Sequence, residues 1–131
     1  YLQTHTVTIE SLIASFGPGF FSVNILGVNN IRDIQTDTNA GKKTLAVRLG
    51  RQSAILLYVI FNALAYFTPV VLSILIGNYW LLLPLISLPF SIFLIKNLYR
   101  YSGSDLNTVL SGTGQLLVIF GLMMSISYLL I

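Results

Sequence analysis

The chain has 131 residues, 55% of them hydrophobic and only 8% charged, with seven basic and four acidic side chains and a formal net charge of +3. A soluble domain carries about 25% charged residues and has too little interior at this length for so much apolar surface, so composition excludes a soluble fold and predicts an all-α membrane protein. The lack of cysteine excludes disulfides, thiolate metal sites and cysteine nucleophiles, and a single histidine excludes a multi-histidine metal centre.

The chain begins at Tyr1 in a polar stretch that has neither the basic flank nor the apolar run of a signal peptide. We therefore expect further membrane spans to precede it in the intact protein. On this interpretation residues 1–131 form the C-terminal part of a single transmembrane domain. His5 lies in the polar stretch, and we interpret it as solvated or structural.

Four apolar stretches follow, each close to the roughly 20 residues that a helix needs to cross a hydrocarbon core of about 30 Å. They cover about residues 9–28, 53–76, 79–98 and 106–131. Proline and glycine predict irregular geometry within three of them. These residues are Gly17, Pro18 and Gly19 in the first stretch, Pro69 in the second, and Pro84 and Pro89 in the third.

Short connections indicate how the later spans are arranged. Gly77-Asn78 predicts a tight turn, so the second and third spans should lie antiparallel and side by side. Before the fourth span, Ser104 is the predicted N-cap, and Asp105 lies in the first turn, where a carboxylate suits the helix dipole.

All seven lysines and arginines fall on one side of this topology. Five lie between the first and second spans, Lys96 lies near the end of the third span, and Arg100 lies between the third and fourth spans. The positive-inside bias therefore places both connections in the cytoplasm, and Gly77-Asn78 and the C-terminus outside. We interpret Tyr101 as an anchor at the inner membrane boundary.

The connection over residues 29–52 carries Asp33 and Asp37, two of the four acidic residues. If the first helix continues that far, the two carboxylates lie one turn apart on one face, within about 6 Å of each other. A divalent cation would reverse their repulsion, and Mg²⁺ is usually held by one or two carboxylates together with substrate phosphates. The spacing therefore predicts a magnesium site at Asp33 and Asp37.

Basic side chains around this pair fit a diphosphate. Arginine binds phosphate oxygens in bidentate fashion and lysine binds them as a point charge, while Gly41 would let the loop turn close to a ligand. The candidate diphosphate ligands are Arg32, Lys42, Lys43 and Arg48, together with Asn29 and Asn30. The plainer alternative is a solvated connector; Asn24, Asn29 and Asn30 count against it, because amides are costly at the end of an apolar helix.

One continuous pattern runs through this block: Asn29-Asn30-x-Arg32-Asp33-x-x-x-Asp37-x-x-x-Gly41-Lys42-x-Thr44-Leu45-Ala46-Val47-Arg48-Leu49-Gly50. It resembles the second aspartate-rich motif of the UbiA-type intramembrane prenyltransferase superfamily. The resemblance extends to Tyr1-Leu2-Gln3, Asp105-Leu106-Asn107 and Phe120-Gly121-Leu122. Within the superfamily, the chain looks most like the 1,4-dihydroxy-2-naphthoate polyprenyltransferases of menaquinone biosynthesis, and less like the 4-hydroxybenzoate and haem farnesyltransferase branches.

The resemblance implies a bundle of nine transmembrane helices around a cavity, with the four spans of this chain as the last four. It implies two aspartate-rich motifs that bind Mg²⁺ and hold a polyprenyl diphosphate at the cytoplasmic mouth. The first motif is expected on the N-terminal half of the same protein. By matching positions, Asp33 and Asp37 become catalytic metal ligands, Arg32 and Lys42 become catalytic diphosphate ligands together with Arg48, and the amides Asn29 and Asn30 orient these groups.

The implied reaction transfers a polyprenyl group to 1,4-dihydroxy-2-naphthoate with loss of CO₂, giving demethylmenaquinol or demethylmenaquinone. The implied location is a bacterial inner membrane, with the block in the cytoplasm and no nucleic-acid partner. Residues 1–131 alone are expected to be inactive. Prenylation of 4-hydroxybenzoate or homogentisate and a non-catalytic membrane subunit stay open, whereas a cation transporter is disfavoured because its carboxylates should lie near the bilayer midplane.

Polar and aromatic side chains within the spans have two interpretations. Asn62, Asn107 and Gln115 are interpreted first as interhelical hydrogen-bond partners and second as cavity-lining residues. Five aromatic residues are candidates to pack along a prenyl tail, although lipid-facing and core positions are the commoner roles. They are Phe61, Tyr66, Phe67, Phe90 and Phe93.

Overall fold

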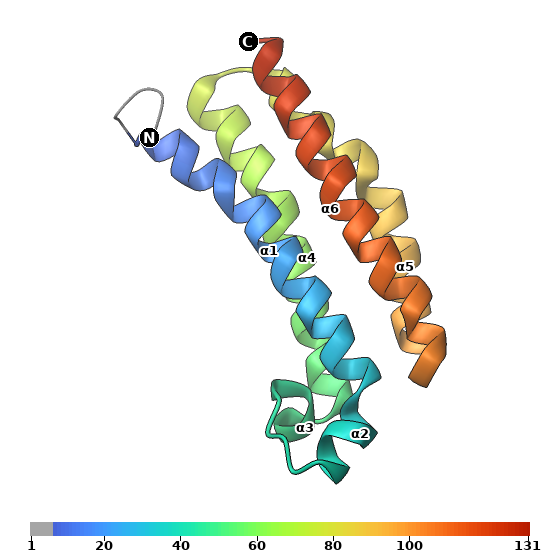
Figure 1. Ribbon diagram of the computed structural model, residues 1–131. Coiled ribbons are helices and arrows are strands. Elements are labelled where there is room, and N and C mark those ends of the chain that lie inside the picture. Colours follow the sequence, from blue (N-terminus) through green and yellow to red (C-terminus); the bar gives the residue numbers. More distant parts are fainter. Residues whose placement is uncertain (1–6) are drawn as a thin grey trace.

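The computed structural model describes residues 7–131 and consists of four long antiparallel helical segments with two short helices at one end (Figure 1). No strand forms within these residues. The features assigned to Tyr1-Leu2-Gln3 and to His5 lie outside the described residues. The prediction of an all-α membrane protein with four spans is confirmed.

Four segments are long and apolar enough to cross a membrane: Ile9–Arg32, Arg51–Ile76, Tyr79–Arg100 and Gly103–Leu129. The first is α1 (Ile9–Arg32) and the second is α4 (Arg51–Ile76). Both extend into the block that we expected to be a loop over residues 29–52. That boundary was wrong because no helix breaker separates Val28 from Arg32, so the backbone hydrogen bonds of α1 continue through the polar residues.

The third span changes its helix type where the prolines predict a disturbance. Its first part, η1 (Tyr79–Ser87), is a 3₁₀-helix that contains Pro84, and its second part is α5 (Leu88–Arg100), with Pro89 in the first turn. Proline is tolerated there because the first turn of a helix has no partner for its N–H groups. By contrast, α1 and α4 continue as α-helices through Pro18 and Pro69.

The fourth span is α6 (Leu106–Leu129), preceded by the 3₁₀ turn η2 (Gly103–Asp105). Ser104 was predicted to cap this helix, and that prediction was wrong. The N-cap position belongs to Asp105, whose side chain makes no capping hydrogen bond. Because Ser104 lies inside the 3₁₀ turn, its hydroxyl is one residue too early to reach the first free N–H groups of α6.

Close packing near the middle of the bundle depends on Gly17. A Cβ atom at this position would lie 2.7 Å from Cε1 of Phe120 and 2.8 Å from Oγ1 of Thr68, so only glycine lets α1 approach α4 and α6 this closely. Beside it, the rings of Phe21, Tyr66 and Phe120 meet edge to face with centroids 5.0–5.7 Å apart. This aromatic cluster joins three of the spans.

Buried polar side chains also link the spans. Tyr58 and Thr113 share a hydrogen bond of 3.0 Å between α4 and α6, and the Ser91 hydroxyl of α5 donates to Asn62 Oδ1 of α4 at 2.7 Å. The amide of Asn24 donates to the Tyr58 carbonyl oxygen at 3.1 Å. The first interpretation of Asn62, as an interhelical hydrogen-bond partner, is confirmed.

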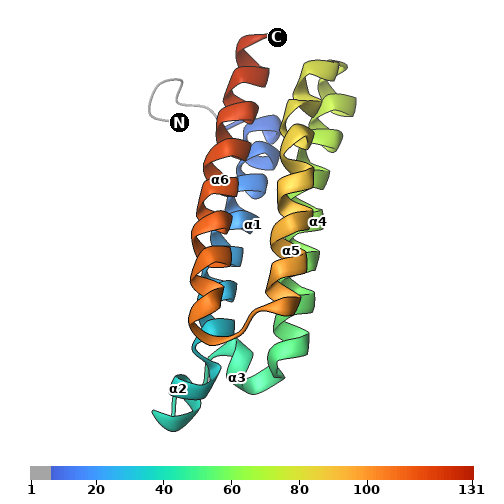
Figure 2. The ribbon, with the colours of Figure 1, turned by 90° about the vertical axis from the view of Figure 1, so that its right-hand side faces the viewer.

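The two ends of the bundle differ in charge. Figures 1 and 2 show the α1–α4 connection and the α5–α6 connection at one end, and the α4–η1 turn and the C-terminus at the other. The described chain therefore gathers all seven lysines and arginines at or near the first end. The fold therefore places the basic residues at one end of the bundle, as the sequence indicated.

Candidate functional site

The site begins where α1 ends. Asp33 leaves helical geometry at φ −96°, ψ 9°, and α2 (Ile34–Asn39) starts immediately after it. The expected continuous helix is therefore interrupted at the first carboxylate. The Asp37 N–H still donates to the Asp33 carbonyl oxygen at 2.8 Å, so the two acidic residues keep their separation of one turn.

Arg32 pairs with Asp33 at the point where the helix is interrupted. Its Nε–H donates to Oδ1 of Asp33 and its Nη2–H donates to Oδ2, both at 2.8 Å. Adjacent side chains of a regular helix do not face each other, so the departure from helical geometry at Asp33 favours this bidentate pair. These hydrogen bonds, with the charges of Arg32 and Lys42, hold the pKa of the Asp33 carboxyl below its ordinary value against an opposing effect of burial.

Arg32 also connects two helices. Nη2 donates to Oδ1 of Asn29 at 2.8 Å, and Nη1 donates to Oδ1 of Asn107, the second residue of α6, at 2.7 Å. Four of the five N–H groups of this guanidinium are thus directed at residues of the chain itself. Arg32 therefore holds the Asp33 carboxylate in place, and the fifth N–H group of its guanidinium makes no hydrogen bond within residues 7–131.

The second carboxylate is buried and belongs to a tight turn. Asp37 is only 7% exposed and pairs with Lys42 Nζ at 3.1 Å, whereas the Lys42 side chain is 66% exposed. The Lys42 N–H also donates to the Asp37 carbonyl oxygen at 2.9 Å. Gly41 makes this turn at φ +71°, a left-handed conformation that glycine adopts without strain. The chain thus turns at Gly41, as predicted, and the approach of this turn to a ligand stays a prediction.

The remaining candidate ligands lie apart from this pair. Lys43 and Arg48 are exposed, and neither forms an ion pair within residues 7–131. Arg48 is on α3 (Leu45–Leu49), which packs mainly against α4. Asn30 lines a small pocket of about 130 Å³ between α1, α3 and α4. The structure therefore brings Asn29 into the Arg32 cluster and places Asn30 on another side of α1.

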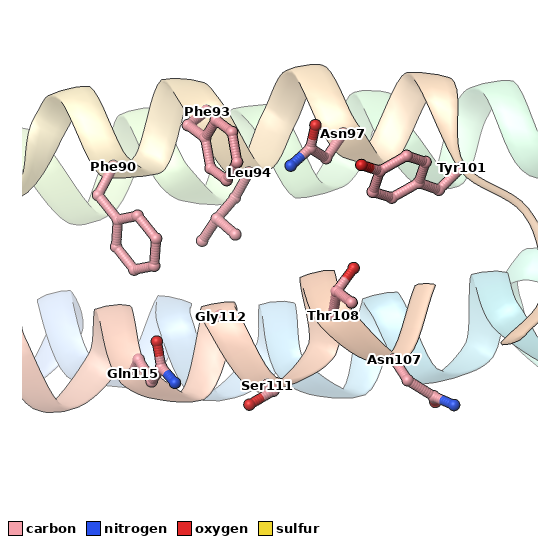
Figure 3. Close-up of a pocket in the computed structure, with 10 residues that line it drawn as sticks. All are labelled: Phe90, Phe93, Leu94, Asn97, Tyr101, Asn107, Thr108, Ser111, Gly112 and Gln115. Atoms are coloured by element: carbon pink, nitrogen blue, oxygen red, sulfur yellow. The ribbon is translucent and has the colours of Figure 1, made fainter. Parts of the chain in front are cut away.

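A larger groove of about 590 Å³ opens between α5 and α6 (Figure 3). Phe90, Phe93 and Leu94 of α5 form its apolar wall, and Figure 3 shows Phe90 and Leu94 extending toward α6. Tyr101, which we interpreted from the sequence as a membrane anchor, lines the end of this groove that is nearer the charged end of the bundle. Two of the candidate prenyl-tail aromatics, Phe90 and Phe93, line this groove, and a third, Phe61, lines the small pocket beside Asn30. Their packing along a prenyl tail stays a prediction.

The other wall of the groove is polar. Both Asn107 and Gln115 lie in it, as the cavity interpretation of these amides expected. Sequence reasoning missed three other polar residues of the groove, Thr108 and Ser111 on this wall and Asn97 on the α5 wall. A usable signal was present, because positions 107, 108, 111 and 115 share one face of a helix.

The described residues hold no group of three or more histidine, cysteine, aspartate or glutamate side chains arranged to bind a metal. Asp33 and Asp37 provide two carboxylates one turn apart. Each of them already pairs with a basic side chain, Asp33 with Arg32 and Asp37 with Lys42. Such a donor set suits a hard cation that takes its remaining ligands from phosphate and water, and it does not suit a closed protein cage.

The model of the UbiA prenyltransferase family matches residues 1–111. The chain belongs to this family. It is similar to UbiA prenyltransferase domain-containing protein 1 of Dictyostelium discoideum, at 40% identity over 98% of the chain and 38% of that protein. It is also similar to the 1,4-dihydroxy-2-naphthoate octaprenyltransferases of Mycobacterium leprae, at 33% identity over 93% of the chain and 41% of that protein, and of Haemophilus influenzae, at 48% identity over 38% of the chain and 16% of that protein.

The chain corresponds to only part of each of these UbiA relatives. Where the similarity runs through nearly the whole chain, the chain spans about two fifths of the relative's length. No solved structure matches it. The matched region contains the block over residues 29–52 and the groove-lining residues up to Ser111.

Proposed function

We propose that the full-length protein transfers a polyprenyl group from a prenyl diphosphate to an aromatic acceptor in a Mg²⁺-dependent reaction, and that this chain supplies one half of the diphosphate site. Membership of the UbiA prenyltransferase family supports the reaction class. The observation that carries the proposal is the pair Asp33 and Asp37, held one helical turn apart and flanked by Arg32 and Lys42. The N-terminal half of the same protein would supply the rest of the site.

Asp33 and Asp37 are the residues that would hold Mg²⁺. When bound, the metal would neutralise charge that develops on the departing diphosphate. The pKa of Asp33 lies below its ordinary value, so this carboxylate is ionised at neutral pH. The neighbouring guanidinium of Arg32 keeps it pointed in one direction by a two-pronged contact.

The basic residues divide into two groups by their contacts. Arg32 orients Asp33, because nearly all its donors are engaged within the chain. Lys42 is exposed and held by a single ion pair, so it can turn to a phosphate oxygen while staying near Asp37. Lys43 and Arg48 are exposed at the same end of the bundle and complete the set of proposed phosphate-binding cations.

The reaction that fits this site begins with cleavage of the allylic C–O bond, whose electron pair leaves with the diphosphate. The electron-rich aromatic ring forms a carbon–carbon bond to the prenyl carbon. With 1,4-dihydroxy-2-naphthoate, the prenyl group replaces the carboxylate overall and CO₂ is released, giving demethylmenaquinol. The protein contributes preorganised charge at the leaving group, which is the largest contribution in many reactions of this kind.

The naphthoate is the acceptor that we favour, because several relatives are named 1,4-dihydroxy-2-naphthoate octaprenyltransferases. The Dictyostelium relative is 40% identical over 128 residues, a longer match than that to the Haemophilus enzyme, and its name gives no acceptor. For this reason 4-hydroxybenzoate and homogentisate are included as competing acceptors in the test below. We place the block over residues 29–52 on the cytoplasmic side of a bacterial inner membrane, in keeping with the positive-inside bias.

The test uses the full-length protein in membranes with Mg²⁺, a polyprenyl diphosphate and each acceptor in turn. We expect the naphthoate to be prenylated and Asp37→Asn to lower the turnover by about 100-fold or more, since the variant loses one of the two proposed carboxylate ligands of the Mg²⁺ that would stabilise the leaving group. The matched control is Asp105→Asn, which removes an exposed carboxylate outside the site. Near-normal turnover of the Asp37 variant would refute the catalytic assignment, and no prenylation of any acceptor by the wild type would favour the non-catalytic subunit.

A further inference from the structure

The α5–α6 groove has an unusual composition for the surface of a membrane bundle. Asn107, Thr108, Ser111 and Gln115 are all exposed along one face of α6. Gln115 lies eight residues from Asn107, which is about 12 Å along the helix at 1.5 Å per residue. Amide and hydroxyl groups at that depth are costly against lipid and normally face a cavity or a partner.

Several of these polar groups have nothing to bind within the described chain. The side chains of Asn97, Ser111 and Gln115 make no hydrogen bond to residues 7–131, whereas buried polar residues of the same spans, such as Asn62 and Thr113, are paired. The groove therefore offers free donors and acceptors from both helices, Asn97 on α5 and Ser111 and Gln115 on α6. On the α5 wall the Phe90 and Phe93 rings stack with centroids 6.5 Å apart.

This combination matches one chemical class of ligand. A flat aromatic ring would stack or pack against the phenylalanine wall, and its hydroxyl groups would exchange hydrogen bonds with the amides and with Ser111. A volume of about 590 Å³ is ample for a two-ring compound. A prenyl tail fits less well, because it would leave the amides of Asn97 and Gln115 without partners.

The inner end of the groove favours a negatively charged substituent. Asn107 lines the groove and accepts a hydrogen bond from Arg32, so the groove begins one side chain away from the Asp33 carboxylate. Arg51 reaches the same end from α4, where its Nη2 donates to the carbonyl oxygens of Leu98, at 2.8 Å, and Tyr101. The guanidinium groups of Arg32 and Arg51 thus contact Asn107 and Tyr101, which line this end of the groove.

We propose that the α5–α6 groove binds the aromatic acceptor, a planar aromatic acid with ring hydroxyl groups, with its carboxylate toward Arg32 and Arg51 and its ring between Phe90 and Ser111. This assignment rests on the proposed function and adds the location of the second substrate. It places the acceptor and the diphosphate on opposite sides of Asn107. Asn107 is then a positioning residue shared by the two sites.

The experiment measures binding separately from turnover. Full-length protein in nanodiscs is titrated with 1-hydroxy-2-naphthoate, a redox-stable aromatic acid, and binding is followed by the fluorescence anisotropy of the ligand against empty nanodiscs. Ser111→Phe fills the groove and should raise the Kd at least tenfold, while the Kd of a prenyl diphosphate changes less than twofold. The matched control is Leu122→Phe, an exposed position on α6 outside the groove, which should leave both values unchanged.

A second variant keeps the proposal testable if Ser111→Phe fails to fold. Gln115→Leu removes a polar group from the groove and suits a membrane helix, so it should raise the naphthoate Kd at least threefold in a well-folded protein. An unchanged naphthoate Kd in folded Ser111→Phe or Gln115→Leu overturns the groove assignment, even where prenyl transfer by the wild type upholds the proposed function. Loss of folding in both variants also overturns it, because it would show that another protein segment fills the groove.

Discussion

Arg32→Lys tests whether this arginine orients Asp33 or binds the substrate directly. A lysine retains the positive charge and can still donate to one oxygen of Asp33 and to one of the two amides, Asn29 or Asn107. Its single nitrogen lacks the fork geometry that lets the guanidinium reach the second Asp33 oxygen and the other amide as well. About two of the four hydrogen bonds are lost. At about 1.5 kcal/mol each, the low end for hydrogen bonds to a charged group because the site is partly exposed, the loss is about 3 kcal/mol.

Each 1.4 kcal/mol or so corresponds to a tenfold change in rate, so the upper limit of the effect is about 100-fold in kcat/KM. The assay is steady-state prenyl transfer by the full-length protein at several concentrations of Mg²⁺ and of prenyl diphosphate. If Arg32 orients Asp33, the concentration of Mg²⁺ needed for half-maximal rate rises and the KM for prenyl diphosphate stays within about twofold. A large rise in that KM with an unchanged Mg²⁺ requirement would refute the orienting role and restore Arg32 as a diphosphate ligand.

Three further predictions concern packing, topology and the completeness of the site. Gly17→Ala should lower the stability in detergent by about 1–3 kcal/mol relative to Gly19→Ala, because its new Cβ meets the buried Phe120 ring at 2.7 Å whereas Gly19 faces open space; equal melting temperatures would contradict this. A cysteine at Asn39 should react with an impermeant thiol reagent only from the cytoplasm, and one at Asn78 only from outside; the reverse pattern would invert the topology. Residues 1–131 expressed alone should insert into membranes without prenyl-transfer activity, and a rate near that obtained on co-expression with the N-terminal half of a related enzyme would rule out the two-motif mechanism.

The membrane spans were predictable because the apolar residues along the chain are enough to identify them. Any helix that must cross about 30 Å of hydrocarbon needs a long apolar run, and four such runs are visible in the sequence. Their inner ends were not predictable, since contacts far along the chain determine them. Arg51 starts α4 at a point where its guanidinium reaches the carbonyl oxygen of Leu98, 47 residues away. The sequence shows only a basic residue at the edge of a charged block.

The candidate site was predictable in its residue types and not in its contacts. The spacing of Asp33 and Asp37 predicted one turn of separation, and a backbone hydrogen bond of 2.8 Å preserves that separation across the break in the helix. The contact between Arg32 and Asn107 joins residues 75 positions apart. No periodicity in either segment indicates that the two helix ends meet, because the packing of α1 against α6 depends on all four spans at once.

These contacts narrow the set of proposed phosphate ligands. The block from Asn29 to Arg51 holds five basic residues and two acidic ones. Arg32 is engaged by Asp33 and two amides, and Arg51 by carbonyl oxygens at the end of α5. Neither can leave its partners without exposing polar groups that depend on it. The exposed positive charge of this block therefore belongs to Lys42, Lys43 and Arg48. Replacement of these residues should alter the affinity for prenyl diphosphate more than the requirement for Mg²⁺.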